Sequence, residues 1–365
     1  MKRVSILLLA LCTCFALATW LQAQPQSRYK VIEFDVLGAG TGAYQGTTPY
    51  CINDAGEVVG WYVDSNNVAH GFVRAPDGDI TTFDAPNSAG TIVYGNNSRG
   101  WITGSYVDAQ GVNHGFLREV DGRITTFDAP DAGAGAGQGT FGNSINAAGE
   151  IVGGYYDANG QSHSLVRSPE GKITEFDPYW PGIGPVANSG TCACQGITPA
   201  GAVAGSYKDP EGVVHPFMRA PDGTFTTFKI PGSLGIYPDA IDAEGAITGA
   251  YFEPAEVYRG YVRTPDGKII KFDDPNAPHG MYQGTFGSGI NAWEEVAADY
   301  FDANFAFHAF IWNPNGSRRL TNFECRNAGT GSYQGTIFNM NNSRGAIQGN
   351  CVDQNNVYHG LLLVP

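Results

Sequence analysis

The sequence of 365 residues has little positive charge, little cysteine and no sustained helical pattern. Its 21 Lys and Arg residues stand against 35 Asp and Glu, which gives a net charge of −14. An acidic surface repels phosphate backbones, so nucleic acid is not an expected partner. After residue 17 no apolar run approaches the roughly 20 residues that a membrane-spanning helix needs. Without a 3.6-residue apolar period, the remaining chain is expected to be all-β.

Cysteine is scarce, and its positions do not recur along the chain. Beyond the N-terminal segment the cysteines are Cys51, Cys192, Cys194, Cys325 and Cys351. An odd number cannot pair completely, and Cys192 and Cys194 are too close for an ordinary disulfide. No neighbouring His or Cys completes a zinc site, and no acidic loop has calcium spacing, so we expect no metal and no cofactor. We predict a disulfide between Cys325 and Cys351, which should lie near the same rim of adjacent units.

The first 23 residues have the features of an export signal. Lys2 and Arg3 form a basic start, residues 4–17 are largely apolar, and Ala18 and Ala23 are small residues that suit cleavage. We therefore expect residues 1–23 to be a signal peptide and residues 24–365 to be one folded domain. This domain is predicted to be a monomer that is secreted, periplasmic or otherwise extracellular.

An acidic and a basic residue six positions apart recur seven times in the sequence. The pairs are Asp64/His70, Asp108/His114, Asp157/His163, Asp209/His215, Glu253/Arg259, Asp302/His308 and Asp353/His359. Each pair lies in the same unit of about 44 to 52 residues, which contains turns, an Ile- or Val-rich run and an aromatic run. Repetition with this period indicates a repeat architecture more firmly than any single motif does.

One unit contains four short strand patterns. In the third unit they are expected at residues 141–146, 151–156, 163–167 and 173–177, separated by turns with Gly149, Gly160 and Gly171. An antiparallel meander of this kind cannot bury both of its faces alone, whereas seven packed radially can. The pattern therefore predicts a seven-bladed β-propeller with four-stranded antiparallel blades. A β-helix is the alternative for such repeats.

The two ends of the chain complement each other. Residues 29–35 match the fourth strand of a unit, and residues 359–364 match the third. We therefore expect the N-terminal strand to complete the last blade and close the ring. An open solenoid would not need this complementarity.

The start of the third strand carries a short motif in several units. His308-Ala309-Phe310, His70-Gly71-Phe72, His114-Gly115-Phe116 and, more loosely, His359-Gly360-Leu361 are its instances. With these residues the chain resembles the bacterial extracellular repeats named for His-Ala-Phe, over residues 29–365. The resemblance implies an exported repeat protein and brings no catalytic residues. His163-Ser164-Leu165 and Arg259-Gly260-Tyr261 depart from the motif, so His is not obligatory in every unit.

The repeated acid and base are interpreted as building elements. An acid in a turn accepts backbone N–H groups, and its partner six residues later faces it across the hairpin. The functional alternative is a metal site or an acid–base pair. Recurrence in all seven units favours the structural interpretation, and so does Arg259, since Arg is not a usual metal ligand.

Three loops end alike just before an innermost strand. Their residues are Tyr44 and Gln45, Tyr282 and Gln283, and Tyr333 and Gln334, each followed by Gly-Thr. We expect these pairs side by side at the mouth of the central channel, where aromatic faces and amides suit a sugar or a peptide. The alternative is that Tyr and Gln merely cap the loop. Tyr179 and Trp180 form a second candidate contact platform, or else fill a gap between blades.

Three classes of function remain open. The first is an exported binding module for a carbohydrate or a cell-surface protein. The second is a glycoside hydrolase or polysaccharide lyase, which needs paired carboxylates; Asp131, Asp239 and Asp274 are placed in suitable loops, but no pair is brought together by the pattern. The third is a structural envelope protein without a small-molecule site. We favour the binding module over an enzyme.

Overall fold

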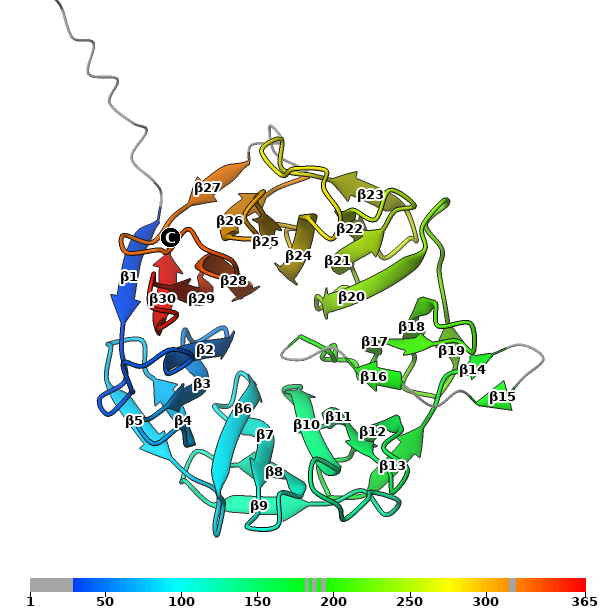
Figure 1. Cartoon of the computed structure of the whole chain (residues 1–365). Coiled ribbons are helices and arrows are strands. Elements are labelled where there is room, and N and C mark those ends of the chain that lie inside the picture. The colour runs from blue at the N-terminus through cyan, green and yellow to red at the C-terminus, as the bar shows by residue number, and fades with distance from the viewer. Residues whose placement is uncertain (1–28, 181–183, 186–188, 192–194, 315–319) are drawn as a thin grey trace, which may run out of the picture.

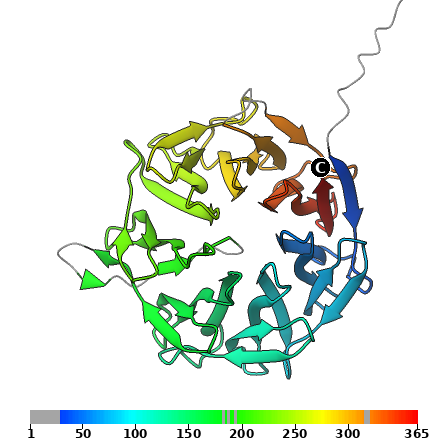
Figure 2. The same cartoon turned by 180° about the vertical axis from the view of Figure 1, so that it is seen from behind.

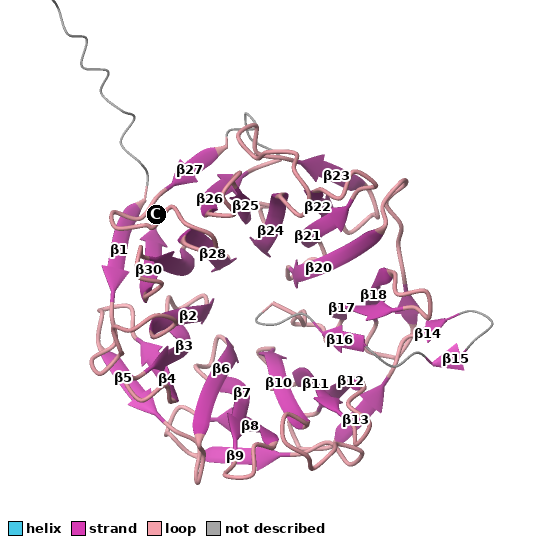
Figure 3. Cartoon of the chain, viewed as in Figure 1, coloured by secondary structure: helices cyan, strands magenta, loops and turns pink. Residues whose placement is uncertain are grey.

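The computed structural model describes residues 29–180, 184–185, 189–191, 195–314 and 320–365. Within these ranges the regular structure consists of strands, and no helix occurs (Figure 3). The strands are arranged around a central channel, as in a β-propeller (Figure 1), and the view from behind shows the same ring (Figure 2). The expected all-β propeller class is confirmed. The predicted signal peptide lies outside the described residues.

The first three repeats are antiparallel meanders, in which each strand pairs with the next along the chain. Their strands are β2 (Gly46–Ile52), β3 (Val58–Val63), β4 (Ala69–Arg74) and β5 (Ile80–Phe83); β6 (Gly90–Asn96), β7 (Ile102–Val107), β8 (Asn113–Arg118) and β9 (Ile124–Phe127); and β10 (Gly139–Ile145), β11 (Ile151–Tyr156), β12 (Ser162–Arg167) and β13 (Ile173–Phe176).

The remaining repeats follow the same pattern, after a small hairpin of β14 (Tyr179–Trp180) and β15 (Gly184–Pro185). The strands are β16 (Ser189–Thr191), β17 (Val203–Lys208), β18 (Val214–Arg219) and β19 (Phe225–Thr226); β20 (Gly235–Ile241), β21 (Ile247–Phe252), β22 (Tyr258–Arg263) and β23 (Ile269–Phe272); β24 (Gly284–Ile290), β25 (Val296–Phe301), β26 (Phe307–Trp312) and β27 (Thr321–Phe323); and β28 (Gly335–Asn341), β29 (Ile347–Val352) and β30 (Tyr358–Val364).

The chain ends meet in the last repeat. β1 (Lys30–Phe34) pairs antiparallel with β30, with Lys30 opposite Val364. At the other end of β30, Gly46 of β2 bridges to Tyr358. These contacts join the first and last repeats, so the chain forms a ring rather than an open array.

Asparagine side chains also connect consecutive repeats at the end of the channel where the first strands finish. Asn53 Nδ2 donates to the carbonyl of Asn97 at 2.9 Å, and Asn97 Nδ2 donates to that of Asn146 at 2.8 Å. Asn342 Nδ2 donates to the Asn53 carbonyl at 2.9 Å, which links the last repeat to the first. Because these amides are buried, each bond satisfies a group that would otherwise be costly to bury.

A β-bulge occurs near the middle of six inner strands. The pairing with the second strand slips by one residue there, and the residues left out of the ladder are Tyr50, Tyr94, Asn143, Asp239, Ser288 and Asn339. A bulge re-aims the side chain of its extra residue. Every one of these side chains is polar, and each lines one of two clefts described below.

The core lies between neighbouring repeats. Aromatic side chains from the third strands, such as Phe72, Phe116 and Phe310, are wholly buried. Burial of one such side chain contributes about 1.5–3 kcal/mol to the stability of the fold.

In the described part of the chain, no helix has the length and apolarity required to cross a bilayer.

Candidate functional site

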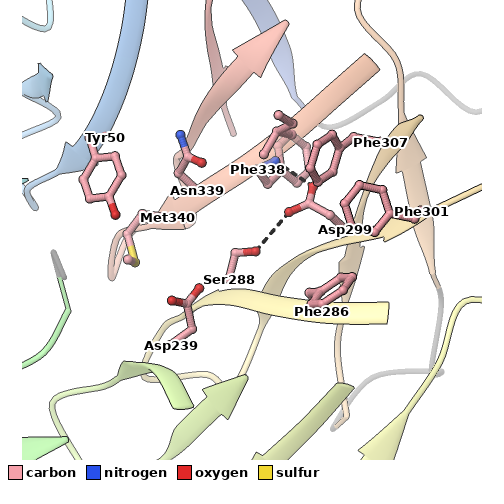
Figure 4. Close-up of a pocket in the computed structure, with 11 residues that line it drawn as sticks. Tyr50, Asp239, Phe286, Ser288, Asp299, Phe301, Phe307, Phe338, Asn339 and Met340 are labelled. Carbon is pink, nitrogen blue, oxygen red and sulfur yellow. Dashed lines mark hydrogen bonds between the residues drawn. The ribbon is translucent and has the colours of Figure 1, made fainter. Parts of the chain in front are cut away.

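A cleft of about 250 Å³ opens on the wall of the channel where the sixth and seventh repeats meet. We call it the acidic cleft. Its lining residues are Tyr50, Asp239, Phe286, Ser288, Asp299, Phe301, Phe307, Ile337, Phe338, Asn339 and Met340. Figure 4 shows Asp239, Ser288 and Asp299 on one side, with Asn339, Met340 and Tyr50 opposite them.

The strand geometry explains why these polar groups converge. Asp239, Ser288 and Asn339 are bulge residues of β20, β24 and β28, so they leave the ladder and face the channel. Asp299 lies on β25, directly behind Ser288. The Ser288 hydroxyl donates to Asp299 Oδ2 at 3.0 Å, and the Phe338 backbone N–H donates to Oδ1 at 2.7 Å. Both carboxyl oxygens of Asp299 are therefore held in place.

Both carboxyls have unusual environments. Asp299 is 3% exposed, and its burial raises its pKa well above the ordinary value, with a smaller contribution from the charge of Asp239. Asp239 reaches the solvent of the channel, yet protein encloses it around the ring. That enclosure raises the pKa of Asp239 to about 7. No Lys, Arg or His is among the described residues that line the cleft, so neither charge is neutralised locally.

At the end of the channel where the first strands finish, one side chain crosses between repeats. Gln195 crosses from the fourth repeat, and its Nε2 donates to the Asn341 carbonyl at 2.7 Å while its Oε1 accepts from the Ile290 N–H at 3.3 Å. Asn341 and Ile290 are the last residues of their inner strands. Phe286 and Phe301 lie toward the opposite end, where the first strands begin.

Aromatic rings form the walls of the cleft at its open end. The Phe301 ring lies 4.3 Å from that of Phe307 and 5.5 Å, edge-on, from that of Phe286. The Tyr333 ring packs edge-on against Phe301 at 5.9 Å. Tyr333 thus stands at the outer rim of the cleft, 61% exposed.

A second cleft, of about 420 Å³, occupies the matching place between the third and fourth repeats. We call it the hydroxyl cleft. Its lining residues are Tyr94, Phe141, Asn143, Gly154, Tyr155, Tyr156, Ser162, His163, Ser189, Gly190 and Ser206. Phe141 and Tyr156 hold the positions of Phe286 and Phe301, and their rings meet edge-on at 5.7 Å. The position of Asp299 is taken by a glycine, Gly154, and no carboxylate lines this cleft among the described residues.

The predicted Tyr-Gln pairs divide into a buried and an exposed half. Gln45 is 9% exposed; its Oε1 accepts the Gly42 N–H at 2.9 Å, and its Nε2 donates to Asn67 at 2.9 Å. Gln334 bonds likewise to Gly331 and to Asn356. These amides are engaged in the hydrogen bonds of their own loops, as the loop-capping alternative expects.

The tyrosines of these loops are exposed and share a rare backbone conformation. Tyr44, Tyr282 and Tyr333 have φ of 66°, 60° and 61°, a left-handed region that non-glycine residues seldom adopt. Tyr282 stacks on Phe252 at 5.7 Å. They lie over the junctions between repeats rather than at the channel axis, since the N–H of Tyr44 donates to the carbonyl of Asn356, in the last turn of the preceding repeat. Their role in binding stays a prediction.

The repeated acid and base pairs form a local clamp. Asp64 Oδ1 accepts the Val68 N–H at 2.9 Å, and this bond lowers the pKa of Asp64. His70 Nδ1 lies 3.0 Å from the Asp84 carboxylate, while its other nitrogen lies 3.8 Å from Asp64. Rings stack in Tyr62/His70, Tyr106/His114, Tyr155/His163, Tyr207/His215 and Tyr300/His308. Each of these histidines is therefore held by its own repeat.

The same clamp varies at three repeats. Arg259 contacts both Glu253 and Asp273. His215 has a 2.7 Å contact with Asp209. In the last repeat His359 Nδ1 lies 3.0 Å from Asp35, the residue after β1, so this clamp also ties the two ends of the chain. In the described part of the chain no three His, Cys, Asp or Glu side chains are grouped to hold a metal ion.

The cysteines are arranged in two ways. Cys325 and Cys351 are free and buried in this structure, and the neighbouring Cys325 thiol, together with burial, raises the pKa of Cys351. The disulfide between them stays a prediction for the oxidised protein. Cys51 is disulfide-bonded, and its partner lies outside the described residues. The Tyr179 and Trp180 side chains also lie outside the description, although their backbone forms β14.

The acids considered from the sequence lie in different places. Asp239 is in strand β20 rather than in a loop, and it lines the acidic cleft. Asp274 is 1% exposed and accepts the Asn276 N–H at 2.8 Å, as a loop cap does. Asp131 is exposed, beside Glu175. None of these three pairs with another.

Asp299 is the acid that the sequence interpretation missed. A comparison of the seven repeats at one position would have found it. The fourth residue of the second strand is Trp61, Ser105, Gly154, Ser206, Ala250, Asp299 and Asn350 in turn. Only the sixth repeat has an acid there. The signal is a departure from the repeat at a position next to the inner strand.

Comparisons with known proteins bear on the fold. No family model matches the chain, and no curated protein matches it in sequence. Among solved structures it is similar to the BP39L lectin from Burkholderia pseudomallei, with 10% identity and a TM-score of 0.52, covering 87% of this chain and 94% of that one. It is also similar to a puromycin hydrolase, with 12% identity and a TM-score of 0.51, covering 84% of this chain and 50% of that one.

A further likeness is weaker. The fucose-specific lectin from Aleuria aurantia shares 13% identity with a TM-score of 0.44, covering 80% of this chain and 96% of that one. At such identities these likenesses describe the architecture and not the activity. The chain thus has the β-propeller fold that its repeats predict.

Proposed function

We propose that the chain is an exported carbohydrate-binding module of the His-Ala-Phe repeat type. Its residues 24–365 would form a monomeric seven-bladed propeller with four strands in each blade, completed by β1. The ligand would occupy the clefts between consecutive blades, entering from the end of the channel opposite Gln195. A glycan, free or on a cell-surface protein, is the expected partner.

The observation that carries this proposal is the pairing of aromatic walls with convergent polar groups in the acidic cleft. Phe286, Phe301 and Phe307 offer partly exposed ring faces, onto which the apolar C–H face of a sugar can pack. Ser288 and Asn339 supply a hydroxyl and an amide at the base. A concave apolar site with a few directed polar groups is the usual form of a small-molecule site.

The similar structures support a binding role without deciding it. One of them is named as a lectin and another as a hydrolase, although the latter is about twice as long as the part matched here. Fold alone does not choose between these activities. The crossing of Gln195 between repeats is also what a purely structural propeller would need. The open aromatic end of the acidic cleft favours a ligand.

A glycan panel tests the proposal directly. The purified domain, residues 24–365, is applied to the panel, and the bound ligands are confirmed by calorimetry in solution. We expect saturable binding that weakens in Phe301→Ala, with no cleavage products. Absence of binding to every glycan would refute the proposal and would leave a protein partner or a structural role.

A hydrolase or lyase is the second candidate, because Asp239 and Asp299 share one cleft and both have raised pKa values. Glycoside hydrolysis uses two carboxyl groups, one of which is protonated at working pH. Here Asp239, the carboxyl open to the channel, would be the acid. Analysis of the panel supernatants for shortened chains decides the matter. Products that vanish in Asp239→Asn would replace the binding proposal by an enzyme.

A further inference from the structure

The charge of the acidic cleft narrows the class of its ligand, provided that the proposed carbohydrate binding holds. Two carboxyl groups line the cleft, and no basic side chain among the described residues compensates them. Asp239 has no hydrogen-bond partner among those residues, whereas Asp299 is held by Ser288 and Phe338. Asp239 is exposed to the channel and has no counter-charge, so it is the carboxyl group with which a bound cation can pair.

The aromatic side chains that line the cleft also favour a positively charged ligand. The ring face carries negative potential, so a cation above Phe or Tyr is attracted even without a carboxylate. Phe286, Phe301 and Phe307 line the open end of the cleft, and Tyr50 faces it across the channel. Carboxyls at the base and rings at the side suit one chemical group, which is a protonated amine on a partly apolar body.

We propose that the acidic cleft binds a protonated amino sugar, with its ammonium group at Asp239 and Asp299 and its ring against Phe301 and Phe307. N-Acetylation of the ligand would remove the charge and fill the space at the carboxyls. A uronic acid would place a like charge there. The cleft therefore selects the free amine over both.

Proton linkage follows from the same arrangement. The titratable groups that face the cleft from its strands are Tyr50 on β2, Asp239 on β20 and Asp299 on β25. Enclosure raises the pKa of Asp239 to about 7, so below that pH a cation must displace a proton. Affinity for the amine is expected to rise as pH increases from about 5 toward 7, with release of protons on binding.

The hydroxyl cleft provides an internal contrast. Phe141 and Tyr156 hold the positions of Phe286 and Phe301, whereas Ser162 stands in the place of Phe307. No carboxylate lines this cleft among the described residues, and His163 is one of its lining side chains. An ammonium group there meets ring faces but no carboxyl group, so it should gain less than in the acidic cleft. The amine preference should therefore come mainly from the acidic cleft.

The test is calorimetry of residues 24–365 with a short β-linked glucosamine oligomer, its N-acetylated form and a uronate oligomer, at about 0.15 M salt. We expect the free amine to bind at least about tenfold more tightly than the acetylated form. The preference should disappear in Asp239→Asn and in Asp299→Asn. Asp131→Asn removes one negative charge from a remote exposed loop and should leave it intact, which separates the cleft from the general negative charge of the protein.

Each outcome decides a different question. Equal binding of the three oligomers, or tighter binding of a neutral or acidic one, overturns the amine selectivity and leaves carbohydrate binding standing. An amine preference that survives in Asp239→Asn, whose side chain has no bond to lose, also overturns it. Binding of no sugar of any charge contradicts the proposed function itself, and the selectivity falls with it.

Discussion

The acidic and hydroxyl clefts occupy the same place in the repeat and differ in how their walls are joined. At the acidic cleft, Gly335 of β28 bridges to Phe307 of β26, so the two repeats share one continuous sheet. Between the third and fourth repeats the sheets are separate in the described residues, and the hydroxyl cleft has the larger volume. The acidic cleft is thus the more tightly constrained of the two.

The difference shows how a repeat protein acquires a site. Both clefts inherit aromatic positions and a polar bulge residue from the repeat. Two acids change the chemistry of one cleft only: Asp299, where the other repeats have no acid, and Asp239, at the bulge position that Tyr94 holds at the hydroxyl cleft. The buried carboxyl group of Asp299 is held in place because Ser288 and Phe338 donate hydrogen bonds to it. The residues that build the repeat are therefore different from those that give one cleft its charge.

The largest effect on stability is expected from Gly335→Ala, which would disrupt the backbone bridge between Gly335 and Phe307 beside the acidic cleft. A Cβ there would lie 2.1 Å from the Phe307 carbonyl oxygen, on a backbone with φ of 115°. We expect a loss of about 3 kcal/mol or more in the free energy of unfolding, measured by denaturant titration. Gly232→Ala is the matched control, since Gly232 also has positive φ, 83°, but nothing within 4 Å. Equal losses in both variants would mean that the bridge is unimportant.

The second effect concerns the thiols behind the acidic cleft. The positions that match Cys325 and Cys351 at the hydroxyl cleft are Pro178 and Tyr207. Oxidation to a disulfide should stabilise the protein by about 3 kcal/mol through loop closure. Unfolding is compared before and after mild oxidation, with Cys351→Ser as the control that cannot respond. A thiol titration that finds both groups still reduced in exported protein would contradict the predicted disulfide.

The exposed tyrosines test the outer rim. Replacement of both Tyr282 and Tyr333 by Ala should weaken glycan binding about 100-fold if their faces contact the ligand. Trp293→Ala is the control, because Trp293 is an exposed aromatic residue in the turn after β24, at the other end of the channel. Unchanged affinity in the folded double variant would remove these tyrosines from the site.

The aromatic walls test whether the clefts are independent. Phe301→Ala should weaken binding at the acidic cleft about tenfold, and Tyr156→Ala should do so at the hydroxyl cleft. Each variant should leave the other cleft unchanged, as measured by the two phases of a calorimetric titration. If either variant affects both phases, the clefts are coupled.

The smallest effect is the pH dependence of stability. Burial raises the pKa of Asp299, so the native state keeps its proton to higher pH than the unfolded chain does. Stability then falls as pH rises from about 4 through the native pKa. Asp299→Asn removes this loss, so its melting temperature should exceed that of the wild type at pH 8 and match it near pH 4.

Asp64, in the clamp of the first repeat, provides a control in which stability should change with pH in the opposite direction. The backbone bond from Val68 lowers the pKa of Asp64, so its stabilisation is present above about pH 4 and lost as pH falls below it. Asp64→Asn should therefore lower the melting temperature at pH 7 and have less effect in acid. If the two variants shift with pH in the same direction, the assignment of their pKa shifts is wrong.

Much of the fold could be predicted from the sequence because the same strand and turn pattern occurs in several repeats. The strands predicted at 141–146 and 151–156 agree with β10 and β11 to within two residues at each end. The closure predicted from residues 29–35 and 359–364 corresponds to the pairing of β1 with β30. Alternating side chains and turn glycines are local signals, so they survive in the sequence without any knowledge of distant contacts.

The site was less predictable. The sequence interpretation placed Asp239 in a loop and overlooked Asp299, because a β-bulge and a contact between repeats leave no local pattern. Gln45 was expected to face a ligand, whereas it is buried in its own loop. The crossing of Gln195 to Asn341, far apart in the sequence, has no sequence signal at all.

The sequence by itself determined the strands and the turns, since these depend on side-chain alternation and on glycine at left-handed positions. It also indicated that the acid of each repeated pair caps its own turn, which needs only residues of that turn. The tertiary structure decided which bulge residues share a cleft and which carboxyls lose their solvent. Those outcomes depend on the closure of the ring, which brings Tyr50 and Asp239 to opposite sides of the same cleft and surrounds Asp299 with neighbouring strands.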